Sequence, residues 1–137
     1  MTPEALEGLH ARAVAPARGW SAAEFAALLE SPHVFAVGDA RAVALGRAVA
    51  GEAELLTLAT DPDHRRGGLA RACLAAFAAE ARARGATEAF LEVAADNWAA
   101  RALYVADGWA EAGLRPGYYQ RTGHPPVDAL MLVRTLP

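Results

Sequence analysis

Apolar residues recur at helical spacing in four segments of the chain. The first predicted helix begins at Pro3, since proline and glutamate are common in a first helical turn. The second begins after Ser21, whose side chain can cap it, and ends before Pro32. The third and fourth are predicted from residue 69 to about residue 84 and from residue 97 to about residue 108.

The third predicted helix has one apolar face. We expect the core-facing side to hold Leu69, Cys73, Phe77 and Ala81, and the wetter stripe to hold Arg71, Ala75, Ala78 and Arg82. In this position Cys73 is expected to be a buried, unreactive thiol. Gly85 is placed to end the helix.

Shorter apolar runs between turn residues predict strands. Three of them, at 33–38, 42–49 and 54–60, are close enough to form hairpins. A fourth covers 89–93, and two more near 109–114 and 130–135 flank a predicted loop that contains Arg115, Tyr118 and Tyr119. This order of elements predicts an α+β fold with a mixed sheet covered by helices on both faces.

The composition is that of one globular domain over residues 1–137. The chain is 54% apolar and 21% charged, and it has no apolar run near the roughly 20 residues that span a bilayer. Its N-terminus lacks the basic and apolar segments of a secretion signal. A single cysteine excludes an internal disulfide. These features predict a cytoplasmic protein without a membrane partner.

The charged residues exclude several kinds of chemistry. All 13 basic residues are arginine, so mechanisms that need a lysine, including the P-loop of nucleoside triphosphatases, are excluded. A net charge of −3 argues against a nucleic-acid partner. The four histidines show no metal-ligand spacing, so we expect no metal, and no serine lies in a nucleophile elbow.

The most informative segment, the glycine loop, is defined by Arg65, Arg66, Gly67, Gly68, Leu69 and Ala70. It follows a predicted strand and begins a predicted helix. Glycines allow close approach of a ligand to the backbone, and a helix N-terminus presents free N–H groups to anions. The loop therefore predicts a site for a phosphorylated ligand.

Three further residues are candidates for chemistry. Strand alternation places Glu92 on one face with Phe90 and Ala94, either solvated at the sheet surface or held in a cleft as a general base. Asn97 is most simply a helix N-cap. Tyr104 follows on the same helix, where it serves either as an aromatic residue at the core edge or as a donor in a site.

Together these residues resemble the GNAT superfamily of acetyl-CoA-dependent N-acetyltransferases. Arg65-x-x-Gly68-x-Ala70 matches its (Gln/Arg)-x-x-Gly-x-(Gly/Ala) loop. A second match lies downstream, at Asn97, Ala100, Leu103, Tyr104, Gly108 and Trp109. Within the superfamily the chain is similar to the RimI type, which acetylates ribosomal proteins at N-terminal alanine. The segments that support this are Gly19-Trp20-Ser21, Leu91-Glu92-Val93, Arg115-x-x-Tyr118-Tyr119 and Asp128-Ala129-Leu130-Met131.

The resemblance implies a role for each matching residue. Glu92 would be the general base, acting directly or through water, and Tyr104 the acid for the departing thiolate. Trp20, Tyr118 and Tyr119 would bind the acceptor. The implied acetyl-CoA site comprises Leu58, Thr60, Arg65, Arg66, Gly67, Gly68, Leu69, Ala70 and Asn97, with the Leu58 region near the acetyl carbonyl.

The chain also departs from the superfamily pattern. Its first element is a helix at Pro3, so the strand that usually opens this fold is expected to be missing, which leaves about six strands and one edge exposed or covered by a partner. Trp109 replaces the usual phenylalanine, and Pro116-Gly117 can reshape the acceptor groove.

The implied function is acetyl transfer to an amine, with a protein N-terminus as the leading acceptor. Acetylation of a small-molecule amine and a non-catalytic CoA-binding module are the alternatives. The assembly is expected to be a monomer or a homodimer.

Overall fold

A computed structural model describes residues 1–15 and 17–137. Its helices are α1 Pro3–Val14, α2 Ala22–Leu29, α3 Leu69–Ala83 and α4 Trp98–Ala106, with a short 3-10 helix η1 at Pro62–His64. Its strands are β1 Val34–Asp39, β2 Ala42–Val49, β3 Glu52–Thr60, β4 Glu88–Ala94, β5 Ala110–Arg121 and β6 His124–Thr135. They form one six-stranded sheet in the order β1-β2-β3-β4-β6-β5. The predicted α+β fold with a mixed sheet is confirmed.

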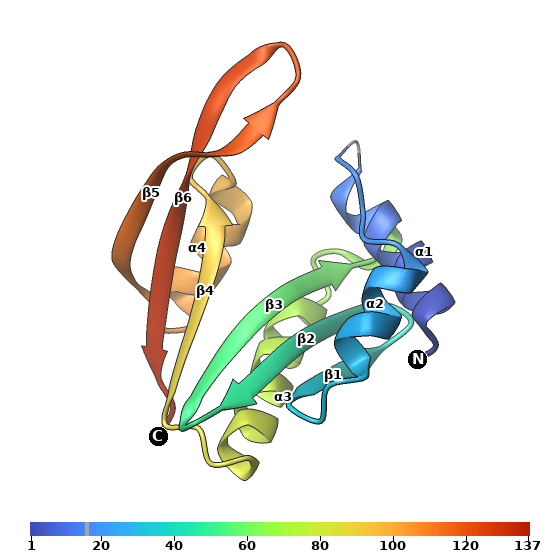
Figure 1. The fold of residues 1–137 in the computed structure, drawn as a ribbon, viewed down its shortest axis with the longest axis vertical. Helices are drawn as coiled ribbons and strands as arrows, with labels where there is room; N and C mark the ends of the chain where they lie inside the picture. The colour runs from blue at the N-terminus through green and yellow to red at the C-terminus, as the bar shows by residue number, and fades with distance from the viewer. Residues whose placement is uncertain (16) are drawn as a thin grey trace.

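The sheet is mostly antiparallel and is covered by helices on both faces (Figure 1). Helices α1 and α2 pack on one face, over a cluster that includes Leu6 and Phe25. Helices α3 and α4 pack on the other face, over a larger cluster. Alternation along β2 supplies both layers, because Val43 and Leu45 belong to the first cluster and Ala44 to the second.

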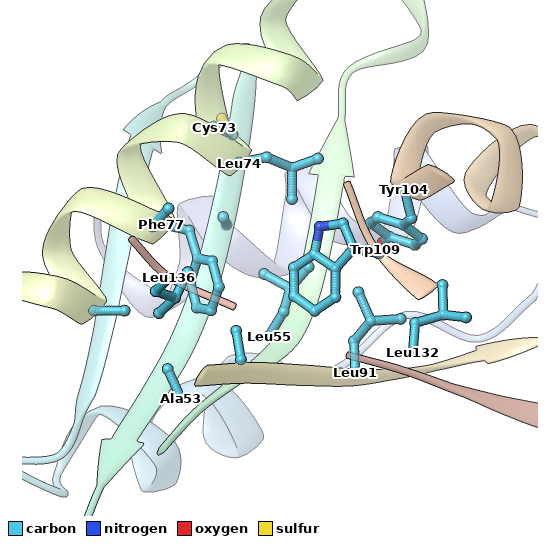
Figure 2. Packing of buried hydrophobic residues seen from close by; sticks show 14 of the residues in the cluster. Ala53, Leu55, Cys73, Leu74, Phe77, Leu91, Tyr104, Trp109, Leu132 and Leu136 are labelled. Carbon is cyan, nitrogen blue, oxygen red and sulfur yellow. The ribbon is translucent and has the colours of Figure 1, made fainter. Parts of the chain in front are cut away.

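The larger cluster joins the two halves of the sheet (Figure 2). Trp109 lies among Leu55 of β3, Leu74 of α3 and Leu91 of β4, and its side chain is almost fully buried. Its indole Nε1 donates to the Asp107 carboxylate at 3.1 Å, so the polar atom of this aromatic side chain is satisfied. The residue that replaces phenylalanine therefore packs without leaving a buried donor unpaired.

Gly46 of β2 is required by a close contact between the sheet and α3. The rings of Phe35 and Phe77 stack with centroids 5.8 Å apart. A Cβ atom at position 46 would lie 2.5 Å from Phe35 and 2.7 Å from Phe77. Only glycine leaves room for this aromatic pair, which fixes α3 against the strands that precede the glycine loop.

The sheet opens between its two central strands. β3 and β4 are parallel neighbours, but they pair only from Glu52 opposite Glu88 to Glu54 opposite Phe90. Directly after this point the register between β2 and β3 shifts, which leaves Leu56 as an extra residue in β3. In Figure 1 the carboxyl ends of β3 and β4 diverge, and the edge of β3 that faces β4 is left without a partner strand in the described part of the chain.

Two predictions about local structure are wrong. Ala78 was expected on the wet stripe of α3, but it is buried, as is Leu74, because α3 packs against both β2 and β3 and needs a wider apolar face. The predicted loop around Arg115, Tyr118 and Tyr119 is instead a long antiparallel hairpin formed by β5 and β6.

The prolines at the start of β6 explain the second error. Pro125 and Pro126 cannot donate ladder hydrogen bonds and therefore argue against a strand. They precede Ala129, the first residue of β6 that pairs with β4, so they lie in the part of the hairpin that extends beyond the rest of the sheet in Figure 1. There only β5 pairs with β6, with Arg121 opposite His124 at the turn.

Candidate active site

A cleft of about 1420 Å³ lies where β3 and β4 separate. One wall is the segment 55–58 of β3, and the other is the segment 91–94 of β4. The segment that joins α1 to α2 and the tip of the β5–β6 hairpin also border it. The cleft brings together six of the predicted site residues: Trp20, Leu58, Glu92, Asn97, Tyr104 and Tyr119.

Glu92 lies in the middle of β4 and faces the cleft. The predicted alternation is confirmed, since Leu91 and Val93 are buried while Glu92 is 21% exposed at its side chain. Its Oε1 atom lies 3.0 Å from Nη2 of Arg115 in β5. Glu92 is therefore a partly shielded carboxylate that has one ion-pair partner and borders the cleft.

Tyr104 borders the cleft from α4. Its residue is only 8% exposed, and its ring packs against Trp109 with centroids 6.0 Å apart. Burial raises the pKa of Tyr104 to about 12, with a smaller contribution from Tyr119. No acceptor within residues 1–15 and 17–137 takes its hydroxyl, yet that oxygen is not sealed from solvent. Tyr104 is thus a protonated donor whose free hydroxyl is available to a ligand.

Asn97 begins α4 and lies at the cleft. Its Oδ1 accepts a hydrogen bond from the backbone N–H of Ala100 at 3.2 Å, which confirms the predicted N-cap. The cap uses only the side-chain oxygen, so the Asn97 amide can still donate to a ligand. The two interpretations of this residue are compatible.

The glycine loop lies outside the cleft, at the N-terminus of α3. Arg66 and Gly68 have positive φ angles of 68° and 76°. No acceptor in the described part of the chain takes the backbone N–H groups of Leu69, Ala70 and Arg71, and α3 has no side-chain cap. This geometry suits an anion, because several donors point outward at the positive end of a fifteen-residue helix.

The remaining predicted site residues lie away from the cleft lining. Arg65 donates from Nη2 to the carbonyl of Ala13 at 3.0 Å, which ties the glycine loop to α1. Thr60 is the last residue of β3. Tyr118 is 51% exposed and packs edge-on against Tyr119, with ring centroids 5.1 Å apart.

Sequence reasoning missed His10, which is buried in α1 and borders the cleft. Its Nδ1 accepts from the backbone N–H of Trp20 at 2.8 Å, so the ring proton lies on Nε2, which bonds the Thr57 hydroxyl at 3.1 Å. Desolvation lowers the pKa of His10 and favours this neutral form. Its place on the apolar face of α1, beside Leu6 and Leu9, predicts burial but carries no signal for a partner 47 residues away.

Sequence reasoning also missed Arg115 as a partner of Glu92. The sequence placed this residue in a predicted loop and in a segment similar to RimI-type proteins, and side-chain directions in a loop are undefined. Once β5 is a strand, Arg115 stands opposite Ala129 of β6 and reaches toward β4. The tip of the hairpin makes a second such contact, an ion pair between Arg121 and Asp96.

Neither a metal site nor a membrane span is found among the described residues. No group of three His, Cys, Asp or Glu side chains in ranges 1–15 and 17–137 is arranged to hold a metal ion. None of the helices described has the length and apolar character needed to cross a membrane.

Known proteins are similar to this chain in sequence and in fold. The chain is 44% identical over 85 residues to the ribosomal protein bS18-alanine N-acetyltransferase of Escherichia coli (strain K12), covering 62% of this chain and 57% of that protein. It is 35% identical over 113 residues to the N-alpha-acetyltransferase RimI of Mycobacterium tuberculosis, covering 76% and 70%. The chain therefore aligns with little more than half the length of the Escherichia coli relative.

The structural comparison covers more of the chain. The crystal structure of the ribosomal-protein-S18-alanine N-acetyltransferase from Escherichia coli matches with a TM-score of 0.86 and 33% identity, over 98% of this chain and 87% of that one. The sequence profile of the acetyltransferase (GNAT) family matches residues 9–109. With this match and with the sheet that opens between β3 and β4, the chain belongs to the acetyltransferase (GNAT) family.

Proposed function

We propose that this protein transfers an acetyl group from acetyl-CoA to the N-terminal α-amine of a protein. The observation that carries the proposal is the cleft, where a carboxylate and a buried tyrosine hydroxyl from different elements border the open edge of β3. The names of the sequence relatives, which are alanine and N-alpha acetyltransferases, support this kind of acceptor. The single buried thiol, Cys73, fits a reducing compartment such as the cytoplasm.

The residues around α3 fit the phosphate end of CoA. The free N–H groups at the start of α3 would bind the pyrophosphate, with the positive φ angles of Arg66 and Gly68 turning the backbone around it. Arg65 would hold this loop in place through its bond to α1.

The open edge of β3 fits the pantetheine arm. Beyond Glu54 the backbone of β3 has no partner strand on the side of β4 among the described residues, so its N–H and C=O groups can pair with the amides of the arm. Leu58 borders the cleft from this edge, and its backbone region would hold the acetyl carbonyl. Asn97 can donate its free amide from the opposite side of the cleft.

Glu92 would take up the proton that the reaction releases, and Tyr104 would assist the leaving sulfur. Acetyl-CoA supplies the acetyl group as an activated thioester. Glu92, directly or through water, takes the proton that the amine loses as its C–N bond forms. An α-amine has a pKa near 8, compared with about 10.4 for lysine, so a larger fraction of a protein N-terminus is already neutral at neutral pH. An N-terminal amine therefore depends less on Glu92 to become a nucleophile. Tyr104 donates a hydrogen bond to the sulfur as the bond between sulfur and the acetyl carbon breaks.

The raised pKa of Tyr104 determines whether it gives the leaving sulfur a proton or a hydrogen bond. A free thiol has a pKa near 8.5, so full proton transfer from a tyrosine at about 12 to a solvated thiolate is uphill. Burial in the cleft raises the pKa of the thiol as well and narrows this gap. We infer that the Tyr104 hydroxyl stabilises the developing charge on sulfur through a hydrogen bond, and that the positioning of both substrates supplies much of the rate.

The aromatic residues at the cleft mouth fit a peptide acceptor. Trp20, held by its backbone bond to His10, and Tyr119 border the cleft from opposite sides. Tyr118 extends this surface outward along β5. A groove that continues past the catalytic pair suits an extended chain better than a small amine.

Turnover of acetyl-CoA with a panel of short peptides and small amines tests the proposal. We expect acetylation of peptides at their N-termini and little with simple amines. Acetylation of small amines alone would favour the second candidate acceptor class. CoA binding without transfer to any amine would show a non-catalytic module and would overturn the proposed enzyme.

A further inference from the structure

Arg115 places a positive charge beside Glu92, the carboxylate that the proposed reaction requires. The pair spans two strand spacings, because β6 lies between β5 and β4. Arg115 stands opposite Ala129, which stands opposite Ala94, two residues beyond Glu92 on the same face of β4. The small alanine side chains in this row leave a path along which the guanidinium reaches Glu92, with Nη2 3.0 Å from Oε1.

This ion pair is held loosely. The Arg115 side chain is 56% exposed, and an exposed ion pair contributes little net free energy. In the same conformation the guanidinium lies 5.4 Å from the ring centroid of Tyr118, within cation–π distance, so it keeps one favourable contact when it gives up the carboxylate. Arg115 can therefore leave Glu92 at small cost.

Another cation must reach the same carboxylate during acetyl transfer. An N-terminal amine with a pKa near 8 is mostly an ammonium ion at neutral pH. Among residues 1–15 and 17–137, Arg115 is the only cationic side chain within ion-pair distance of Glu92. The arriving ammonium and the Arg115 guanidinium thus compete for one negative charge.

We propose that Arg115 is an exchangeable counter-ion, which occupies in the free protein the place at Glu92 that the acceptor's ammonium takes in the complex. This inference rests on the proposed function. Arg115 is then a positioning residue that sets acceptor affinity: it pairs with Glu92 while the groove is empty, and it gives up Glu92 and keeps its contact with Tyr118 when the peptide arrives.

Steady-state kinetics of Arg115→Gln and Arg115→Lys test this exchange, with a peptide whose free N-terminus the unmodified protein acetylates as the acceptor. Removing the internal competitor lowers KM for the acceptor by about two- to fivefold, the range that an exposed ion pair supports, with kcat nearly unchanged. Arg115→Lys keeps the cation and restores a KM near that of the unmodified protein. An unchanged or higher KM in Arg115→Gln, a fall in kcat, or a low KM in Arg115→Lys would overturn the proposal.

Arg47→Gln is the matched control. Arg47 and Glu54 form an ion pair across β2 and β3 with side-chain exposures of 44% and 25%, close to the 56% and 21% of Arg115 and Glu92. This pair is not among the residues that line the cleft. Its removal should leave both KM and kcat unchanged; a KM that falls equally in both variants would refute a specific role for Arg115.

A peptide with a blocked N-terminus distinguishes loss of the Arg115 charge from loss of the space that its side chain occupies. The N-acetylated product has no ammonium, so its inhibition constant should be the same with Arg115→Gln as with the unmodified protein. An inhibition constant that falls as much as KM would mean that Arg115 only occupies space. Equilibrium binding of free and blocked peptides to the CoA-loaded variants gives the same comparison without turnover. Failure of acetyl transfer itself is therefore distinguishable from failure of this inference.

Discussion

Glu54 of β3 lies opposite Phe90 of β4 at the last position where these two strands pair. One residue later each strand enters the wall of the cleft, and the extra residue Leu56 turns β3 away. The loss of sheet pairing therefore creates two features at once: a backbone edge open to a ligand, and a space into which Glu92 projects from the neighbouring strand.

The glycine loop can be tested with two glycines at opposite ends of α3. Gly68 and Gly85 both have positive φ angles, of 76° and 91°, and a Cβ atom at either position would meet nothing within 4 Å. Each alanine substitution should cost about 1 kcal/mol of stability through backbone strain. We expect only Gly68→Ala to weaken CoA binding, measured by titration calorimetry. Equal weakening in Gly85→Ala would remove the loop from the CoA site.

Tyr104→Phe should lower kcat roughly 100-fold, within the range for loss of a positioned proton donor. The ring stays packed against Trp109, so the affinity for CoA and the melting temperature should change little. Tyr118→Phe removes a hydroxyl that lies outside the cleft lining, so it should leave kcat unchanged, whatever its effect on the KM for the acceptor. An unchanged kcat in Tyr104→Phe would exclude this hydroxyl from the reaction.

The pH dependence of kcat, measured at a saturating concentration of the acceptor, should lack a basic limb up to about pH 10.5. The active form of Tyr104 is protonated, and a pKa raised to about 12 keeps it protonated throughout this range. The value of kcat should therefore rise as the bound acceptor amine, which has an ordinary pKa near 8, loses its proton, and then level off. A tyrosine at its ordinary value near 10 would already halve the rate at pH 10, and such a decline would contradict the assignment.

Asp107→Ala should destabilise the fold by about 2 kcal/mol, because it leaves the buried indole N–H of Trp109 and the partly buried guanidinium of Arg134 without this acceptor. The Asp107 carboxylate accepts from Trp109 at 3.1 Å and from Arg134 at 2.8 Å. Urea unfolding measures the loss. Asp39→Ala, which removes an exposed carboxylate paired with Arg41, should cost much less. Similar losses in both variants would show that the Asp107 contacts are not specific.

The sequence predicted the order of elements because most of them carry strong local signals. The capping box at Ser21 and Glu24 is present, and the strand at Glu92 alternates as its apolar pattern requires. The hairpin of β5 and β6 was missed because Pro125 and Pro126 have a local preference against strands, which pairing beyond the sheet edge overrides.

The candidate site was only partly predictable, because local motifs can be read from the sequence but contacts between distant segments cannot. Two motifs with fixed spacing predicted Gly68, Asn97 and Tyr104 as site residues, since each motif lies within a short segment. The partners of His10 and Glu92 depend on contacts between distant segments, and no periodicity in the sequence encodes them. The opening of the sheet after Glu54 likewise depends on the pairing of three strands at once.

The most direct test of the proposed function uses one peptide that carries both a free α-amine and an internal lysine. After incubation with the protein and acetyl-CoA, tandem mass spectrometry locates the acetyl group. We expect it on the N-terminal residue, with no modification of the same peptide when its N-terminus is blocked. Acetylation of the lysine alone, or of neither amine while CoA still binds, would contradict N-terminal acetyl transfer.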